Sequence, residues 1–134
     1  MASVHKEILI EALPEHVWAA IRDYGAVRRL VPALVDCRLE GDVRIVTFPD
    51  GRVAREVLVD INDARRRLVY AEPGGRFITR SASMQVFDYA ENGSRLVWIN
   101  DVLPDEFAEM IARNMDRGLL SIKRTLESSH NREA

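Results

Sequence analysis

The stretch from Gly93 to Leu126, GSRLVWINDVLPDEFAEMIARNMDRGLLSIKRTL, passes from a predicted strand into a predicted long helix. The strand covers 95–102, and Pro104-Asp105-Glu106 opens a helix that we expect to continue to about Ser128. The apolar residues of this helix recur at spacings of three and four: Phe107, Ile111, Met115, Leu119, Ile122 and Leu126. They form one continuous stripe, which must lie against another layer. Gly118 interrupts it, either as a tolerated glycine, or to allow close approach to another backbone or to leave room for something else.

Upstream of this stretch, the chain alternates strand-like segments with turns. The predicted strands are 3–12, 34–40, 43–48, 53–60, 66–72 and 77–89. From residue 34 onward, the breaks between them are short and rich in Gly, Pro, Asn and Asp, which is typical of antiparallel neighbours. Asn92-Gly93 is the strongest hairpin signal of the set. Between the first two strands, Pro14 opens a helix that ends at Gly25, and a second short helix covers 26–31.

The order of these elements predicts an α+β fold: one strand, two short helices, six strands and one long helix. A seven-stranded antiparallel sheet is wider than a single helix, so it must curl around the helix that covers it. Curling leaves space between the sheet, the long helix and the two short helices. The sequence therefore predicts an internal cavity.

Composition sets the class of the protein. The 134 residues correspond to one domain, 1–134, in which the polar end 128–134 is expected to be a flexible tail. With 47% hydrophobic and 30% charged residues, the chain is globular rather than disordered. A net charge of −2 gives no reason to expect a nucleic acid partner. One cysteine, Cys37, excludes an internal disulfide, and no apolar run approaches the ~20 residues of a membrane span. We expect a soluble, cytoplasmic protein.

Several stretches resemble the helix-grip superfamily, which includes START domains, the birch-pollen allergen group, abscisic-acid receptors and polyketide cyclases, often labelled SRPBCC. These stretches are Pro14 to Trp18, Asp50 to Leu58, Arg67 to Tyr70, Gly93 to Trp98 and Gly118 to Glu127. The resemblance spans Ser3 to Glu127 and is greatest to the polyketide cyclase/dehydrase and lipid transport branch. It implies a curved sheet around the C-terminal helix and a cavity for an apolar small molecule.

The resemblance also implies which residues face that cavity. In the hormone receptors of the superfamily, a segment like Arg55-Glu56-Val57-Leu58 turns its glutamate inward. By that likeness, a set on two adjacent strands would point into the cavity: Ala54, Glu56, Leu58, Tyr70 and Glu72. The receptors' ligand-binding lysine falls near Val31 here, so a hormone-like carboxylate ligand is not supported.

Simple alternation on the strand 53–60 favours the opposite face. Val53, Val57 and Val59 are more apolar than their neighbours, so alternation alone would bury them and expose Glu56. We follow the resemblance, and the outward valines then need cover, which a homodimer would provide.

Two residues are candidates for catalysis, Glu56 and Tyr70. A carboxylate in an apolar pocket would have a raised pKa and could act as general acid or base, and Tyr70 could donate a hydrogen bond to an enolate. Asn100 could orient the ligand. The simpler interpretation is that Glu56 is held by an arginine such as Arg80, or by a hydrogen bond from Tyr70, and does no chemistry. Further residues that could line the cavity or belong to the core are Trp18, Met84, Trp98, Phe107, Ile111 and Met115.

The predicted function is binding of a small apolar molecule, whether polyketide-, lipid- or aromatic-like. A cyclase or dehydratase is the enzyme alternative, and a co-chaperone-like or regulatory partner module is the third. The three histidines have no ligand spacing, and Cys37 has no neighbour that would activate it. No metal and no cofactor are therefore predicted.

Overall fold

The computed structural model describes the backbone of residues 1–133 and the side chains of 1–128. Its elements, in chain order, are β1 (Ala2–Ile10), α1 (Pro14–Arg22), the 3₁₀ turn η1 (Tyr24–Ala26), α2 (Val27–Leu30), β2 (Asp36–Glu40), β3 (Val43–Thr47), β4 (Val53–Asn62), β5 (Arg67–Ala71), β6 (Thr79–Tyr89), β7 (Gly93–Leu103), η2 (Asp105–Phe107) and α3 (Ala108–Glu133). This is the predicted α+β order. None of these helices is long and apolar enough to cross a membrane.

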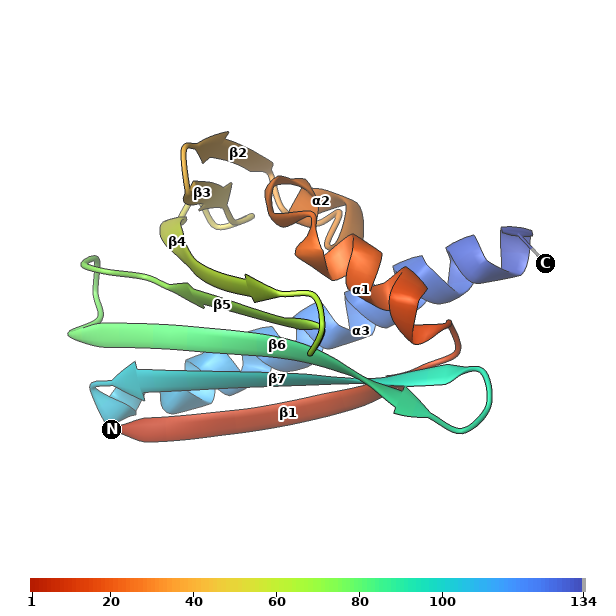
Figure 1. Cartoon of the computed structure of the whole chain (residues 1–134). Helices are drawn as coiled ribbons and strands as arrows, with labels where there is room; N and C mark the ends of the chain where they lie inside the picture. The colour runs from red at the N-terminus through yellow and green to blue at the C-terminus, as the bar shows by residue number, and fades with distance from the viewer. Residues whose placement is uncertain (134) are drawn as a thin grey trace.

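The strands form a single antiparallel sheet in the order β1-β7-β6-β5-β4-β3-β2. All neighbours from β2 to β7 are consecutive in sequence, so this part is the predicted meander, and β1 closes the order by pairing with β7. Figure 1 shows α3 crossing one face of this curved sheet, while α1 and α2 lie between the β2–β4 end and the second half of α3. The hydroxyl of Ser121 on α3 donates a hydrogen bond to the carbonyl of Leu30, at 2.9 Å, which ties α2 to α3.

Two clusters of buried apolar side chains make up the core. The larger one joins α1, the inner face of the sheet and the second half of α3, and the smaller one contains Phe77, Val102, Ile111 and Met115 around the first half of α3. Trp98 packs against both clusters. A Cβ at Gly118 would lie 3.0 Å from Cζ3 of Trp98, so the glycine leaves room for this indole ring. Gly118 thus makes room for a side chain and not for close approach of another backbone.

The inward face of β4 is the one that the resemblance implies. Ala54 and Glu56 are buried, whereas Val53 is 54% and Val59 is 59% exposed. A bulge between Leu58 and Asp60 interrupts the register with β5. Simple alternation fails here because one inward position carries the charged Glu56, so the outward positions look more apolar.

Several element boundaries differ from the sequence expectation by a few residues, most of all at the C-terminal end. Helix α3 extends to Glu133 rather than ending near Ser128, so the expected flexible tail 128–134 begins inside this helix. Ala134 lies outside the described residues. The predicted hairpin at Asn92-Gly93 forms, but Ala90 takes the positive φ of its turn, at 53°. Gly93 is needed for a different reason, because a Cβ there would lie 2.9 Å from the carbonyl oxygen of Tyr89.

Candidate functional site

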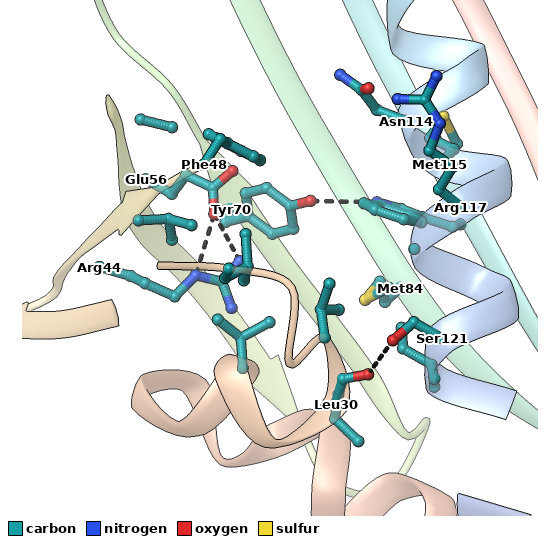
Figure 2. A pocket seen from close by; sticks show the side chains of 18 of the residues that line it. Leu30, Arg44, Phe48, Glu56, Tyr70, Met84, Asn114, Met115, Arg117 and Ser121 are labelled. Atoms are coloured by element: carbon teal, nitrogen blue, oxygen red, sulfur yellow. Dashed lines mark hydrogen bonds and ion pairs between the residues drawn. The ribbon is translucent and has the colours of Figure 1, made fainter. Parts of the chain in front are cut away.

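A cavity of about 400 Å³ lies between the inner face of the sheet, α2 and α3. Ligand pockets in proteins commonly measure ~300–1,000 Å³. Most of its lining side chains are apolar, among them Ile21, Leu30, Val31, Val46, Leu68, Met84, Ile111, Met115 and Ile122. Figure 2 shows Leu30, Met84 and Ser121 close together at one end of this space, and Met115 farther along α3.

The polar part of the cavity wall is built around Glu56, which is 5% exposed. Arg44 on β3 donates to Oε1 of Glu56 from Nη2, at 2.6 Å, and from Nε, at 3.0 Å. Arg80 on β6 donates to Oε2 from Nη1, at 3.0 Å. Both carboxylate oxygens are therefore occupied by buried guanidinium groups. Figure 2 shows the bonds from Arg44 on the side of the cavity opposite α3.

The two arginine partners shift the pKa of Glu56 in the direction opposite to the one expected from the sequence. Burial alone raises its pKa, but the charges of Arg44 and Arg80 and their hydrogen bonds outweigh burial. The pKa of Glu56 therefore lies below its ordinary value, and the prediction of a raised pKa was wrong. A carboxylate that stays ionised, with both oxygens bonded, is a poor general base at neutral pH. Of the two structural interpretations, the arginine partner is correct.

The pKa of Glu72 is shifted in the opposite direction to that of Glu56. Its Oε1 accepts a 2.6 Å hydrogen bond from Nη1 of Arg80, and no second hydrogen bond to this carboxyl is formed by the described residues. Burial raises the pKa of Glu72, and the neighbouring Arg80 offsets that effect only in part. Of the two glutamates in the cavity wall, Glu72 therefore has a pKa above its ordinary value and Glu56 has one below it.

Tyr70 does not bond to Glu56. Its hydroxyl accepts a 3.1 Å hydrogen bond from Nε1 of Trp98, and Figure 2 shows it directed away from Glu56 and toward α3. Burial raises the pKa of Tyr70, so it stays protonated. The tyrosine beside Glu56 is Tyr24, whose hydroxyl donates to the backbone carbonyl of Glu56 at 2.9 Å and whose ring lies 4.0 Å from Cζ of Arg44.

Asn100 also belongs to the polar part of the cavity wall. It is fully buried, and its Oδ1 accepts a 3.0 Å hydrogen bond from Nε of Arg80. Because only the oxygen can accept from a guanidinium, this bond fixes the orientation of the amide. The Nδ2 donor of Asn100 has no hydrogen-bond partner among the described residues.

The structure brings nine of the twelve predicted site residues into the cavity wall. They are Ala54, Glu56, Tyr70, Glu72, Met84, Trp98, Asn100, Ile111 and Met115. Trp18, Leu58 and Phe107 do not line it.

Each of these three side chains has another neighbour. Trp18 donates a hydrogen bond from Nε1 to Asp63 and packs in the larger core cluster. Leu58 lies beside the bulge of β4 and packs against the same cluster. Phe107 packs edge-on against Phe77, with ring centroids 5.2 Å apart.

Sequence reasoning missed Arg44 and named Arg80 only as a possible partner of Glu56. The side chains of both arginines line the cavity. A signal for Arg44 was available: the β3–β4 hairpin pairs Arg44 directly with Glu56. Opposite charges at directly opposed positions of an antiparallel pair attract, so the hairpin register alone would have indicated this pair.

Comparison with known proteins assigns the chain to a protein family. A model of the polyketide cyclase/dehydrase and lipid transport family matches residues 1–127. A search of curated proteins gives no significant match.

Three solved structures illustrate the likeness in fold. An uncharacterized protein from Bacillus thuringiensis is 24% identical with a TM-score of 0.85, over 93% of this chain and 98% of that one. A START superfamily protein from Mycobacterium smegmatis is 15% identical with a TM-score of 0.73, over 98% and 99%. The di-domain ARO/CYC protein BexL, from the BE-7585A biosynthetic pathway, is 14% identical with a TM-score of 0.79, over 95% of this chain and 47% of that one. At these identities the likeness establishes the fold alone.

Proposed function

The chain belongs to the polyketide cyclase/dehydrase and lipid transport family, and we propose that it binds a small, mainly apolar molecule in its cavity. The observation that carries this proposal is the cavity of about 400 Å³ between the sheet, α2 and α3. Protein interiors are close-packed, with few voids larger than a water molecule. A partly open pocket of this size, walled mostly by apolar side chains, suits an apolar guest.

The position of the cavity supports a guest held by several elements at once. Its wall combines residues from both short helices, five strands and α3. Ser121 and Leu30 link α3 to α2 at its border, so a guest would contact two elements that are already tied together. Burial of such a guest gains roughly 25 cal/mol per Å² of apolar surface removed from water.

Native mass spectrometry of gently purified protein tests this proposal, followed by a denatured run that identifies any released molecule. The matched variants are Ala54→Leu, which fills the cavity, and Val53→Leu, which adds volume on the exposed face of the same strand. We expect a stoichiometric apolar species with wild type and Val53→Leu, and a marked loss with Ala54→Leu. Retention of the species by a folded Ala54→Leu would place it outside the cavity and refute the proposal.

An acid/base enzyme is the second candidate, and one observation favours it. Tyr70 and Glu72 lie two residues apart at the end of β5, both in the cavity wall, and the raised pKa of Glu72 suits proton transfer. Glu56 is unsuited to that role because both its oxygens are ion-paired. A cyclase or dehydratase of this kind would lose turnover in Glu72→Gln while the fold is retained, which activity and circular dichroism would measure together.

The third class, a partner module, is less supported because it predicts a filled interior. The expected homodimer and the cytoplasmic location stay predictions. Val53 and Val59 are exposed on the outer face of β4, where a second copy would cover them. Sedimentation velocity of wild type and of Val59→Lys tests this: a dimer that becomes monomeric in the variant supports the interface, and a monomeric wild type refutes it.

A further inference from the structure

Arg80 has hydrogen-bond donors that no described residue uses. A guanidinium carries five N–H groups. In Arg80, whose side chain is 9% exposed, Nε donates to Asn100 and Nη1 donates to both Glu56 and Glu72. The two N–H groups of Nη2 have no acceptor among the described residues. Because Arg80 lines the cavity, these donors are available to a molecule inside it.

Tyr70 supplies a further unused donor nearby. Its oxygen accepts from Trp98, so its own proton must be donated elsewhere, and no described residue accepts it. Cζ of Arg80 lies 5.6 Å from the centroid of the Tyr70 ring. In the sheet register Tyr70 pairs with Ala82, two residues from Arg80, so both side chains are on the inner face. Arg80 and Tyr70 therefore line the same cavity, and each has a donor left for a bound molecule.

The charge balance of this region indicates which kind of oxygen fits. Arg44 and Arg80 are permanently positive, and the doubly paired Glu56 stays negative. The protonation state of Glu72 therefore decides the net charge of these two arginines and two glutamates. The net charge is zero when Glu72 is ionised and +1 when it is protonated. Burial favours the protonated form. The other charged residues of the cavity wall are Asp23, Asp50, Arg52 and Arg117.

We propose that Arg80 and Tyr70 form an oxyanion-binding subsite, so that the guest is an apolar molecule ending in a carboxylate, phenolate or enolate oxygen. The proposal rests on the proposed function and specifies its ligand class. Glu72 occupies Arg80 when the subsite is free, and it takes up a proton when an anion binds. Uptake keeps the buried group of charges neutral in both states, which avoids the cost of an uncompensated buried charge.

This subsite revises an expectation drawn from the resemblance. A carboxylate ligand was not supported because the position of the receptors' lysine falls near Val31. Val31 does line the cavity, as an apolar residue. The cation comes from a different strand, β6, and is a guanidinium held in place by Asn100 and two glutamates.

Isothermal titration calorimetry with two probes of the same shape tests the proposal: 2-naphthoate, an anion, and 2-acetylnaphthalene, a neutral ketone. Wild type should bind naphthoate at least about tenfold more tightly, since a hydrogen bond to a charged group is worth ~1.5–3 kcal/mol. Tyr70→Phe should weaken naphthoate about tenfold and leave the ketone nearly unchanged. Arg80→Lys, which keeps the charge but lacks Nη2, should also lose the preference.

Glu72→Gln provides a result that structural damage cannot imitate. Removing the competing carboxylate should tighten naphthoate binding several-fold. Titrations in two buffers of different ionisation enthalpy should show proton uptake by wild type above the usual glutamate range and none by Glu72→Gln. The matched control is Glu91→Gln, at an exposed position outside the cavity, which should bind as wild type does.

The outcomes separate the two proposals. Equal binding of both probes, or weaker naphthoate binding by a folded Glu72→Gln, would overturn the oxyanion subsite and leave the cavity function standing. No binding of either probe, together with no co-purified apolar species, would overturn both.

Discussion

Nη2 of Arg44 lies 2.6 Å from Oε1 of Glu56, and the two residues face each other directly across β3 and β4. Both side chains are buried, and Arg80 binds the other carboxylate oxygen from β6. One carboxylate thus links three strands on the inner face of the sheet. The pair therefore shapes the polar wall of the cavity instead of supplying a proton-transfer group.

Glu56→Gln should strongly destabilise the fold. The variant leaves two buried guanidinium groups with no carboxylate between them, and breaking a buried ion pair on one side costs ~3–5 kcal/mol. Urea-induced unfolding at pH 7 measures this loss. The matched control is Glu7→Gln: Glu7 pairs with Arg95 at 3.1 Å on the exposed face, where a pair is worth about 0–1 kcal/mol. Equal effects of the two variants would contradict the role given to Glu56.

The stability that Glu56 contributes should depend on pH with a defined sign. Because the folded-state pKa of Glu56 is lowered, its contribution is fully present above the unfolded value of about 4.3. It is lost as the pH falls through the folded value. The difference in unfolding free energy between wild type and Glu56→Gln should therefore be constant near neutrality and shrink in acid. A difference that shrinks as the pH rises toward 7 would show a raised pKa instead.

The two glutamates of the cavity wall should titrate on opposite sides of the ordinary range. Carbon-13 NMR of the side-chain carboxyls should place the midpoint of Glu56 below that of an exposed glutamate and the midpoint of Glu72 above it, because Glu56 has two guanidinium partners and Glu72 shares one. Glu72→Gln and Glu56→Gln assign the two signals. Coincident midpoints would contradict the charge balance on which the oxyanion subsite depends.

Gly118→Ala should narrow the cavity. The new Cβ would lie 3.0 Å from Cζ3 of Trp98, so the indole must move, and Trp98 is part of the cavity wall. Better helix propensity gains about 1 kcal/mol, while crowding in a packed core costs ~1–3 kcal/mol, so the net loss of stability should be small. We expect weaker probe binding and a shifted Trp98 fluorescence spectrum, recorded in a Trp18→Phe background.

Arg113→Ala is the control for that experiment, since Arg113 is exposed on the same helix and does not line the cavity. It should leave probe affinity and the fluorescence spectrum unchanged. Unaltered probe binding by Gly118→Ala would show that Trp98 moves without entering the cavity.

The inward face of β4 illustrates what pattern reasoning could and could not decide. Alternation favours burial of the valines because it counts apolar residues on each face, whereas the resemblance places Ala54 and Glu56 inside, and the resemblance is correct. A buried charge cannot be recognised from its own strand, because the partners that compensate it lie elsewhere. Arg80 is separated from Glu56 by the whole of β5.

The sequence by itself determined the order of the elements, the meander, the apolar stripe of α3 and the existence of a cavity, because these follow from local periodicity, turn residues and the width of the sheet relative to one helix. Only the tertiary structure decided the chemistry of that cavity. The direction of the pKa shift of Glu56, the unused donors of Arg80 and the direction of the Tyr70 hydroxyl depend on distances between strands. Such distances are set by register and curvature, and electrostatic and hydrogen-bond energies change steeply with them.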